Sequence, residues 1–341
     1  MLRFESDYTE GCIPQILERL QRINFEKNPG YGTDEIWESA KMKIRKACNC
    51  PDAEIYFLVG GTQTNSTVLD GLLQKYEAVI APKTGHIACH EAGAIEDSGH
   101  KVIELPEQNG KLLPETLQNY AQTFFGDVNN QHMPQPAAVY ISLPTEYGTL
   151  YTAAELKEIR KICDTYNLKL FVDGARLGYG LAAQNNDVTL EILSQNADAF
   201  YIGGTKVGAL FGEAVVFPKP GSVPHFFTLI KQHGALLAKG WLLGVQFDEL
   251  FTDDLYFKIA KNAVILADKM ESAFINKGYK TFISSPTNQK FIILENSKMK
   301  KLEKSVTFSF WEKYDENHTV VRFATSWATK EDDVNKLIEL I

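Results

Sequence analysis

Three short segments of the sequence carry residue types that could do chemistry together, and each follows a run of strand-forming residues. The first is Gly60-Gly61-Thr62, directly after EIYFLV (54–59). Glycines let backbone N–H groups approach an anion, a threonine hydroxyl adds a donor, and a helix that begins there adds positive potential. We expect this turn to hold a phosphate. The plainer interpretation is a tight turn that caps the following helix.

The second segment is FVDGAR (171–176), in which an apolar strand leads to Asp173 and then to Arg176. A carboxylate at a buried strand end is costly to leave unpaired, so it requires a cationic partner. A protonated ring nitrogen would supply that partner. A plain ion pair between Asp173 and Arg176 is the alternative.

The third segment is YIGGTKVG (201–208), where one lysine, Lys206, lies among small and apolar residues. A lysine with its ordinary pKa of about 10.4 is a poor nucleophile at neutral pH. Desolvation or a nearby cation lowers that pKa and exposes the lone pair needed for imine formation. Lys206 is therefore expected to be reactive, the alternative being a loop lysine whose amine reaches water.

In this order the three segments supply a phosphate cup, a partner for a ring nitrogen and an imine-forming amine, which together are what pyridoxal phosphate (PLP) requires. A dinucleotide-binding fold would need G-x-G-x-x-G after an early strand, and GGTQTN (60–65) lacks that spacing. A non-enzymatic binding protein on the same fold stays an alternative, because a fold does not fix a function.

The elements that must position these residues are strand-like runs alternating with stretches of helical period, the pattern of a layered α/β core. The stretch 153–166 is predicted to be a helix between two of the strands. The expected strands are 54–59, 78–82, 101–105, 137–143, 169–174, 199–204 and 213–217.

The pattern of predicted strands and helices changes at about residue 246. A long helical stretch (257–278) is followed by the β-type runs 290–294, 305–311 and 319–325 and a closing helix (330–341). We predict a large PLP-binding domain over residues 20–245. Residues 246–341, joined by 1–19, are predicted to form a smaller α+β domain.

The composition restricts which class of ligand and which cellular compartment are expected. A formal net charge of -8 argues against nucleic acid and anionic membranes as partners, so a small molecule is expected. No apolar run of 18 residues appears, and Glu5 and Asp7 stand where a signal peptide needs an apolar core, which predicts a cytoplasmic protein. Five cysteines without paired spacing indicate neither a disulfide framework nor a metal site.

Several other segments of the chain, together with these three, match the pattern of one known family. The sequence resembles the low-specificity L-threonine aldolase family of the aspartate-aminotransferase-like PLP enzymes, and the resemblance spans nearly the whole chain. DGAR (173–176) and the His86 segment are its most specific parts. The matching segments are FESD (4–7), YGTD (31–34), GGT (60–62) with Asn65, His86-Ile87 with Glu91, Gly93-Ala94, DGAR, Lys206 and Val321-Arg322-Phe323.

The resemblance implies the PLP-dependent transferase fold: an α/β protein with a three-layer large domain around a mainly parallel mixed sheet, and a smaller α+β C-terminal domain. It implies that Lys206 holds PLP as a Schiff base, that Asp173 pairs with the ring nitrogen and that His86 lies over the ring. Gly61 and Thr62 would meet the phosphate.

The same resemblance implies that Ser6, Arg176 and Arg322 bind the substrate carboxylate. Related enzymes are homodimers or homotetramers with active sites at the subunit interface. Tyr31, as a substrate contact, and Lys239, as a cofactor contact, are therefore expected to act from a neighbouring chain.

The reaction implied is cleavage of L-threonine, L-allo-threonine and related β-hydroxy amino acids to glycine and an aldehyde. Arginine suits the carboxylate because its planar fork donates two parallel hydrogen bonds, and fixing the carboxylate selects the Cα bond that breaks. His86 is the candidate base for the β-hydroxyl proton, because imidazole titrates at about 6.5. Stacking of His86 on the ring, without proton transfer, is the alternative.

The chain also departs from the family pattern. Where many relatives carry Glu-Asn-Thr-His-Asn, it reads LPTEYG (143–148), and Gly60 replaces a serine in the phosphate turn. Contacts near the substrate β-substituent must therefore differ. β-Elimination or transamination at the same cofactor stays open as an alternative, and would give pyruvate or a keto acid as product.

Overall fold

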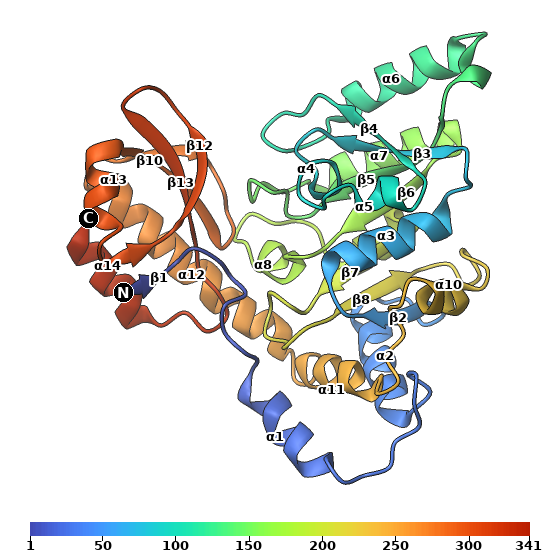
Figure 1. Cartoon of the computed structure of the whole chain (residues 1–341), viewed down its shortest axis with the longest axis horizontal. Helices are drawn as coiled ribbons and strands as arrows, with labels where there is room; N and C mark the ends of the chain where they lie inside the picture. The colour runs from blue at the N-terminus through green and yellow to red at the C-terminus, as the bar shows by residue number, and fades with distance from the viewer.

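The computed structural model describes all residues, 1–341, and its centre is a seven-stranded sheet (Figure 1). Four of its six strand pairings are parallel and two, β2 with β8 and β7 with β8, are antiparallel. The predicted mixed, mainly parallel sheet is therefore confirmed. In spatial order the strands are β2 (Glu54–Leu58), β8 (Glu213–Phe217), β7 (Ala199–Gly203), β6 (Lys169–Asp173), β5 (Gln135–Ser142), β3 (Glu77–Pro82) and β4 (Lys101–Leu105).

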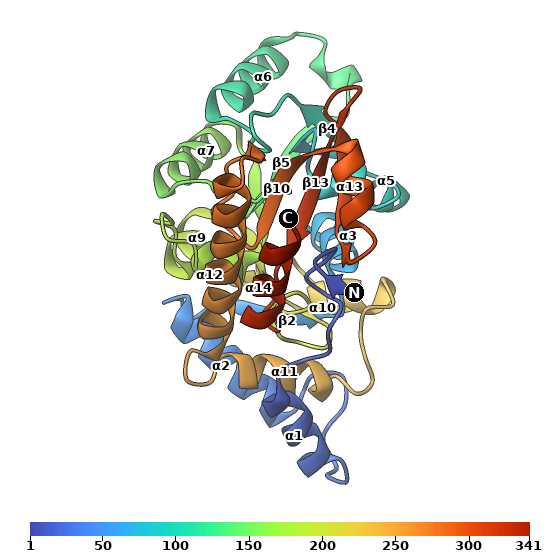
Figure 2. The same cartoon turned by 90° about the vertical axis from the view of Figure 1, so that its left-hand side faces the viewer.

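Side chains alternate along these strands, so each face of the sheet has its own core. In β5, Val139 and Ile141 belong to one hydrophobic cluster and Tyr140 to another. Figure 2 shows the result as three layers, with α7 and α9 on one side of the strands and α3, α5 and α10 on the other. Helices of the second cluster are α3 (Gly61–Leu72), α4 (His86–Cys89), α5 (Ala94–Asp97) and α10 (Phe226–Gln232).

The first cluster is larger and takes in the remaining long helices. Figure 1 shows α12 running from the large sheet toward the C-terminal part of the chain. No helix of the chain combines the length and apolar character needed to cross a bilayer. Helices of this cluster are α1 (Pro14–Ile23), α2 (Glu35–Ala47), α6 (Pro114–Gly126), α7 (Ala153–Tyr166), α8 (Leu177–Leu181), α9 (Leu190–Asn196), α11 (Trp241–Leu250) and α12 (Leu255–Asn276).

The bounds of α7 agree with the prediction for residues 153–166, and local signals explain why. The Thr152 side chain accepts from the backbone N–H of Glu155 while the Glu155 side chain accepts from that of Thr152, a capping box that starts the helix. The helix ends at Asn167, whose φ of 53° lies in the left-handed region.

A second, antiparallel sheet of four strands forms the C-terminal part, with the order β12-β13-β10-β9. The chain's start joins it: β1 (Leu2–Arg3) pairs in parallel with β11 (Val306–Thr307), and Phe4 is buried in the same hydrophobic cluster. The run 305–311, predicted as one β segment, is divided between β11 and β12. The remaining elements are β9 (Lys280–Ile283), β10 (Gln289–Glu295), α13 (Asn296–Leu302), β12 (Ser309–Lys313), β13 (His318–Ala324) and α14 (Glu331–Leu340).

Candidate active site

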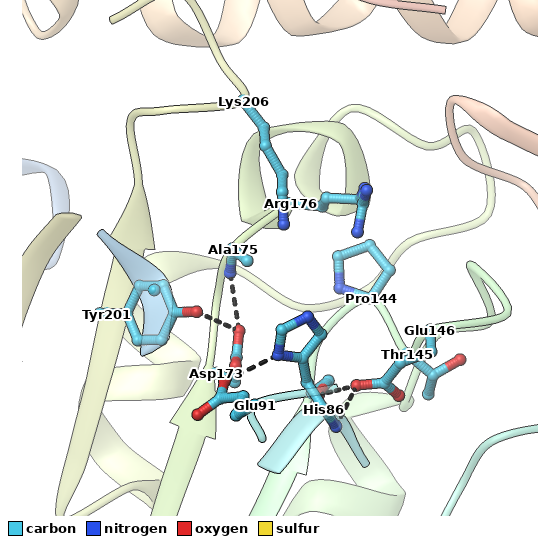
Figure 3. A pocket seen from close by; sticks show the side chains of 12 residues that line it. His86, Glu91, Pro144, Thr145, Glu146, Asp173, Ala175, Arg176, Tyr201 and Lys206 are labelled. Carbon is cyan, nitrogen blue, oxygen red and sulfur yellow. Dashed lines mark hydrogen bonds and ion pairs between the residues drawn. The ribbon is translucent and has the colours of Figure 1, made fainter. Parts of the chain in front are cut away.

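The carboxyl ends of neighbouring strands bring the predicted chemical residues together, as open α/β sheets do with their ligand sites. β6 ends at Asp173, and β7 ends at Gly203, just before Lys206. A cavity lies at these ends, which we call the strand-end cavity (Figure 3). It is lined by Gly61, His86, Glu91, Ser142, Pro144, Thr145, Glu146, Asp173, Ala175, Arg176, Tyr201 and Lys206.

Asp173 is buried, and its carboxylate accepts four hydrogen bonds. Oδ1 accepts from the Tyr201 hydroxyl at 2.5 Å and from the backbone N–H of Ala175 at 3.0 Å. Oδ2 accepts from the Tyr140 hydroxyl at 2.6 Å and from Asn65 Nδ2 at 3.0 Å. These donors fix the orientation of the carboxylate at the strand end.

The electrostatic balance at Asp173 keeps it ionised. Burial raises the pKa of this carboxyl, but the charge at His86 and the tyrosine hydroxyls that donate to it outweigh burial and hold the pKa below its ordinary value. Arg176 forms its ion pair with Asp7 instead. The alternative of an Asp173–Arg176 ion pair is therefore wrong for this chain.

Lys206 follows a stretch in which backbone packs closely against backbone. A Cβ at Gly203 would lie 2.3 Å from the carbonyl oxygen of Ala175, so only glycine fits there. The Lys206 Nζ lines the cavity without a hydrogen bond or ion pair in the chain. Burial, with the nearby Arg176 cation, lowers the pKa of Lys206 below its ordinary value. The surroundings of Lys206 therefore favour the lowered pKa that the sequence predicts for its amine.

The glycine turn leads directly into α3, whose first residue is Gly61. No side chain caps this helix, so its first-turn N–H groups are open to an anion, and a Cβ at Gly60 would meet nothing within 4 Å. Gly61 lines the strand-end cavity. Thr62 is exposed and lines neither this cavity nor its neighbour.

His86 begins α4 and is held by two carboxylates. Its Nδ1 lies 2.7 Å from Glu91 Oε1, and its backbone N–H donates to Glu146 Oε1 at 2.9 Å. Glu91 is buried, and the same oxygen accepts from Asn65 Nδ2 at 2.7 Å. With Nδ1 donating to Glu91, Nε2 is the ring atom of His86 left for a ligand.

A second cavity of about 390 Å³ adjoins the first, between the loops of the large sheet and strands β12 and β13. We call it the inter-sheet cavity. Its size suits a small-molecule ligand. Four residues, His86, Glu146, Arg176 and Lys206, line both cavities. The inter-sheet cavity is lined by Tyr8, His86, His90, Glu146, Arg176, Lys206, Ser309, Phe310, Trp311 and Arg322.

Two arginines face the inter-sheet cavity. Arg176 donates from Nε and Nη2 to the two oxygens of Asp7, at 2.7 and 2.9 Å, while its Nη1 makes no hydrogen bond in the chain. The Asp7 side chain is fully buried; burial raises its pKa, but Arg176 outweighs burial and lowers the pKa to about 2. Arg322 stacks over Trp311 with its guanidinium carbon 5.6 Å from the ring centroid.

Several buried donors near these arginines have no partner. They include Ser6 Oγ and Arg322 Nε. Ser6 is flanked in sequence by Glu5 and Asp7. The carbonyl of Glu5 accepts from Arg322 Nη2 at 3.1 Å. Buried polar groups are rarely left unpaired, so an anionic ligand group fits here.

Four of the predicted site residues line neither cavity: Ser6 and Thr62, described above, and Tyr31 and Lys239. Tyr31 is 43% exposed, and Lys239 is exposed as well. The backbone N–H of Tyr31 donates to the carbonyl of Ala238, next to Lys239, so the two lie close together on the surface. Their role in a neighbouring chain's site stays a prediction.

The sequence patterns do not single out two carboxylates beside the site, the half-buried Glu146 and the buried Glu213. Glu146 lies in LPTEYG (143–148), and Glu213 opens the predicted strand EAVVF (213–217), so neither belongs to a segment predicted to do chemistry. Glu213 accepts from Thr205 Oγ1 at 2.8 Å and from the N–H of Gly204 at 3.1 Å, and burial raises its pKa to about 8. A charged residue opening an apolar strand was the available signal for Glu213.

The residues of the strand-end cavity fit PLP, the cofactor predicted from the sequence. The Lys206 amine has no hydrogen bond or ion pair, with the Tyr8 ring centroid 5.9 Å away, and it lies near a buried, ionised carboxylate, as a Schiff base and a ring-nitrogen contact require. An uncapped helix N-terminus with open space at Gly60 suits the phosphate. These three features belong to one site.

Comparisons with known proteins agree with this chemistry. Residues 3–280 match the family model described as beta-eliminating lyase. The chain is 28% identical to a low specificity L-threonine aldolase from Pseudomonas sp. strain NCIMB 10558, over 98% of this chain and 95% of the relative. It is 38% identical to a solved threonine aldolase of Leishmania major, with a TM-score of 0.96, covering 100% of this chain and 98% of the other.

The fold itself is more widely shared. Aspartate aminotransferase from Thermus thermophilus has a TM-score of 0.73 over 100% of this chain and 90% of its own, at only 14% identity, so that likeness concerns the fold alone. It confirms the predicted aspartate-aminotransferase-like α/β fold. With a family model matching most of its length and a relative 38% identical over nearly all of both chains, this chain belongs to the threonine aldolases of the PLP-dependent beta-eliminating lyase family.

Proposed function

We propose that the chain cleaves L-threonine, L-allo-threonine and related β-hydroxy amino acids to glycine and an aldehyde. The observation that carries the proposal is the position of Lys206. Its amine faces both cavities, so it meets the cofactor residues in one and the arginines of the other. The names of the Pseudomonas and Leishmania relatives support the same reaction.

Lys206 is proposed to hold PLP and Asp173 to keep the ring nitrogen protonated. Bound PLP supplies a carbonyl for the amino group and a ring that withdraws electrons from Cα. The four donors to Asp173 occupy the acceptor capacity of a carboxylate, so a ring N–H would replace one of them. Tyr201 is the donor side chain that also lines the strand-end cavity. Gly61 and Thr62 are proposed to meet the phosphate.

Arg176, Arg322 and Ser6 are proposed to bind the substrate carboxylate. The unpartnered Ser6 Oγ and Arg322 Nε support this role. So does Arg176, whose hydrogen bonds to Asp7 use Nε and Nη2 and leave Nη1 free. Two fixed guanidinium groups would hold the carboxylate in one orientation, and that orientation selects the Cα–Cβ bond. Asp7 is the residue that positions Arg176.

His86 is proposed to lie over the cofactor ring. His86 lines both cavities, and its Nδ1 contact with Glu91 fixes the orientation of the imidazole ring. Both observations support stacking on the cofactor. The sequence also makes His86 a candidate base, and Nε2 is the ring atom that its contact with Glu91 leaves for this role. The experiment at the end of the next subsection separates these two roles.

We propose that the active protein is a homodimer or homotetramer, with Tyr31 and Lys239 reaching the site of a neighbouring chain. Support comes from large apolar side chains left exposed in this region, including Phe25 at 95% and Phe227 at 44%. Size-exclusion chromatography with light scattering measures the assembly. A monomer at micromolar concentration would refute it.

The division of the chain into residues 20–245 and residues 246–341 with 1–19 is likewise a proposal. The pairing of β1 with β11 and the shared cluster around Phe4 support assigning the N-terminus to the smaller domain. We also propose a cytoplasmic location, which five unpaired cysteines support, because disulfides are rare in reducing compartments.

The first experiment is the absorbance spectrum of the purified protein between roughly 300 and 500 nm, before and after borohydride, with peptide mapping. A visible band reduced onto Lys206, with acetaldehyde and glycine released from L-threonine, is the expected result. A band with pyruvate or a keto acid as product would replace the aldolase by β-elimination or transamination. No band after PLP is added would refute the proposal.

A further inference from the structure

Glu146 is the only carboxylate that lines both cavities. The other residues common to the two are Arg176, Lys206 and His86. Two of these are cations, and the Nδ1 of His86 already contacts Glu91. Glu146 therefore contributes the acidic side chain at the junction where cofactor and substrate residues meet, and in Figure 3 it lies beside His86 on the side away from Asp173.

The two oxygens of Glu146 have different surroundings. Oε1 accepts from the backbone N–H of His86 at 2.9 Å and from Ser142 Oγ at 2.7 Å, so the carboxylate is held in one orientation. Oε2 is buried and has no hydrogen-bond partner. Buried carboxylate oxygens are rarely left unpaired, so a ligand hydroxyl at this position would satisfy Oε2.

The other carboxylates near the site do not share this arrangement. Glu91 also has a buried oxygen without a partner, Oε2, but it lines the strand-end cavity only and holds the ring of His86. Glu213 lines neither cavity, and its oxygens accept from Thr205 and Gly204. Glu146 alone has a fixed carboxylate with a free oxygen at the substrate side.

We propose that Oε2 of Glu146 accepts the proton of the substrate β-hydroxyl during cleavage, and is thus a catalytic residue of this chain. The inference rests on the proposed aldolase function. It places the base within LPTEYG (143–148) and leaves His86 to stack over the ring.

The β-hydroxyl proton moves to Glu146, the O–H electron pair becomes the second C–O bond of the aldehyde, and the Cα–Cβ bond breaks. Its electron pair stays on Cα, where the PLP-bound amino acid can delocalise it. Solvent then supplies a proton to Cα to give glycine, and Glu146 returns its proton to solvent.

The ionisation of Glu146 suits a base at neutral pH. Burial raises its pKa to about 7, although the Ser142 hydrogen bond and the His86 charge oppose the rise. A base must be ionised, so cleavage is expected to slow as pH falls below about 7. The titratable and charged groups that face Glu146 are His86, Cys89, His90, Glu91, Tyr140, Tyr151, Asp173, Arg176, Lys206 and Arg322.

The test compares two reactions of Glu146→Gln holoenzyme: cleavage of L-threonine, and exchange of the glycine Cα proton in D₂O, which involves no hydroxyl. Glutamine keeps the Oε1 contacts but cannot take the proton. Cleavage is expected to fall about 10²- to 10⁴-fold while glycine exchange and the visible band stay unchanged. Glu104→Gln, an exposed carboxylate of β4 outside both cavities, is the matched control and retains both reactions.

His86→Phe, which keeps an aromatic ring but no proton acceptor, is expected to lose less cleavage than Glu146→Gln. The proposal is overturned if Glu146→Gln cleaves L-threonine at near the wild-type rate, or if glycine exchange falls in parallel. Should that variant fail to fold, the wild-type pH profile decides: cleavage falls below about pH 7 and glycine exchange does not. Wild type that exchanges glycine without releasing acetaldehyde would instead refute the proposed function.

Discussion

Replacing Asp7 with asparagine would test whether a buried ion pair positions the carboxylate-binding arginine. In the folded chain Arg176 outweighs burial and lowers the pKa of Asp7 from 3.8 to about 2. A shift of about two units corresponds to about 2.5 kcal/mol of stability. Removing one partner of a buried pair costs about 3–5 kcal/mol, because the other charge stays buried. We therefore expect Asp7→Asn to lose about 2.5–5 kcal/mol of unfolding free energy at pH 7.

The sign with pH follows from the lowered pKa. The stabilisation by Asp7 is present above its unfolded pKa of 3.8 and is lost as pH falls from there through about 2. Substrate binding should weaken as well. A charge-assisted hydrogen bond contributes about 1.5–3 kcal/mol, so the KM for L-threonine should rise about 10- to 150-fold once Arg176 is no longer held.

Guanidinium unfolding at fixed protein concentration, followed by tyrosine and tryptophan fluorescence, gives the stability, and acetaldehyde release gives the KM. Glu316→Gln is the matched control, because its ion pair with Lys313 is exposed on both sides, 87% and 64%. That control should change stability by less than about 1 kcal/mol. If Asp7→Asn costs no more than Glu316→Gln and leaves the KM unchanged, Asp7 does not position Arg176.

Three further outcomes follow from the site. Lys206→Ala should lose the visible band and the borohydride-stable adduct, with turnover reduced more than about 10³-fold; an unchanged spectrum would contradict the role of Lys206. Arg322→Lys keeps the charge but loses the planar fork, so the KM for L-threonine should rise about tenfold or more with the cofactor spectrum unchanged. Burial raises the pKa of Glu213 from 4.5 to about 8, so wild type loses stability as pH rises through this window. Glu213→Gln cannot ionise, and its melting temperature relative to wild type should rise between pH 5 and 8.5; a constant difference would contradict the buried, neutral carboxyl.

The sequence by itself determined the sheet and the chemistry at its strand ends. The alternation of β-type runs with helical stretches predicted all seven strands of the large sheet, since short runs rich in apolar and β-branched residues are a local signal. Asp173 and Lys206 could be singled out because Asp173 is the last residue of such a run and Lys206 comes shortly after another. The run 305–311 was misread because two short strands with a break between them look like one apolar segment.

Only the tertiary structure decided which charged groups meet. Asp7 and Arg176 are separated by 169 positions, and their contact depends on the N-terminus crossing to the large sheet from its pairing with β11. The orientation of Glu146 is likewise a tertiary feature. Ser142 and the backbone N–H of His86 donate to Oε1 and leave Oε2 without a partner. Burial and partnership of a carboxylate are set by segments distant along the chain, so no local pattern of residues could assign them.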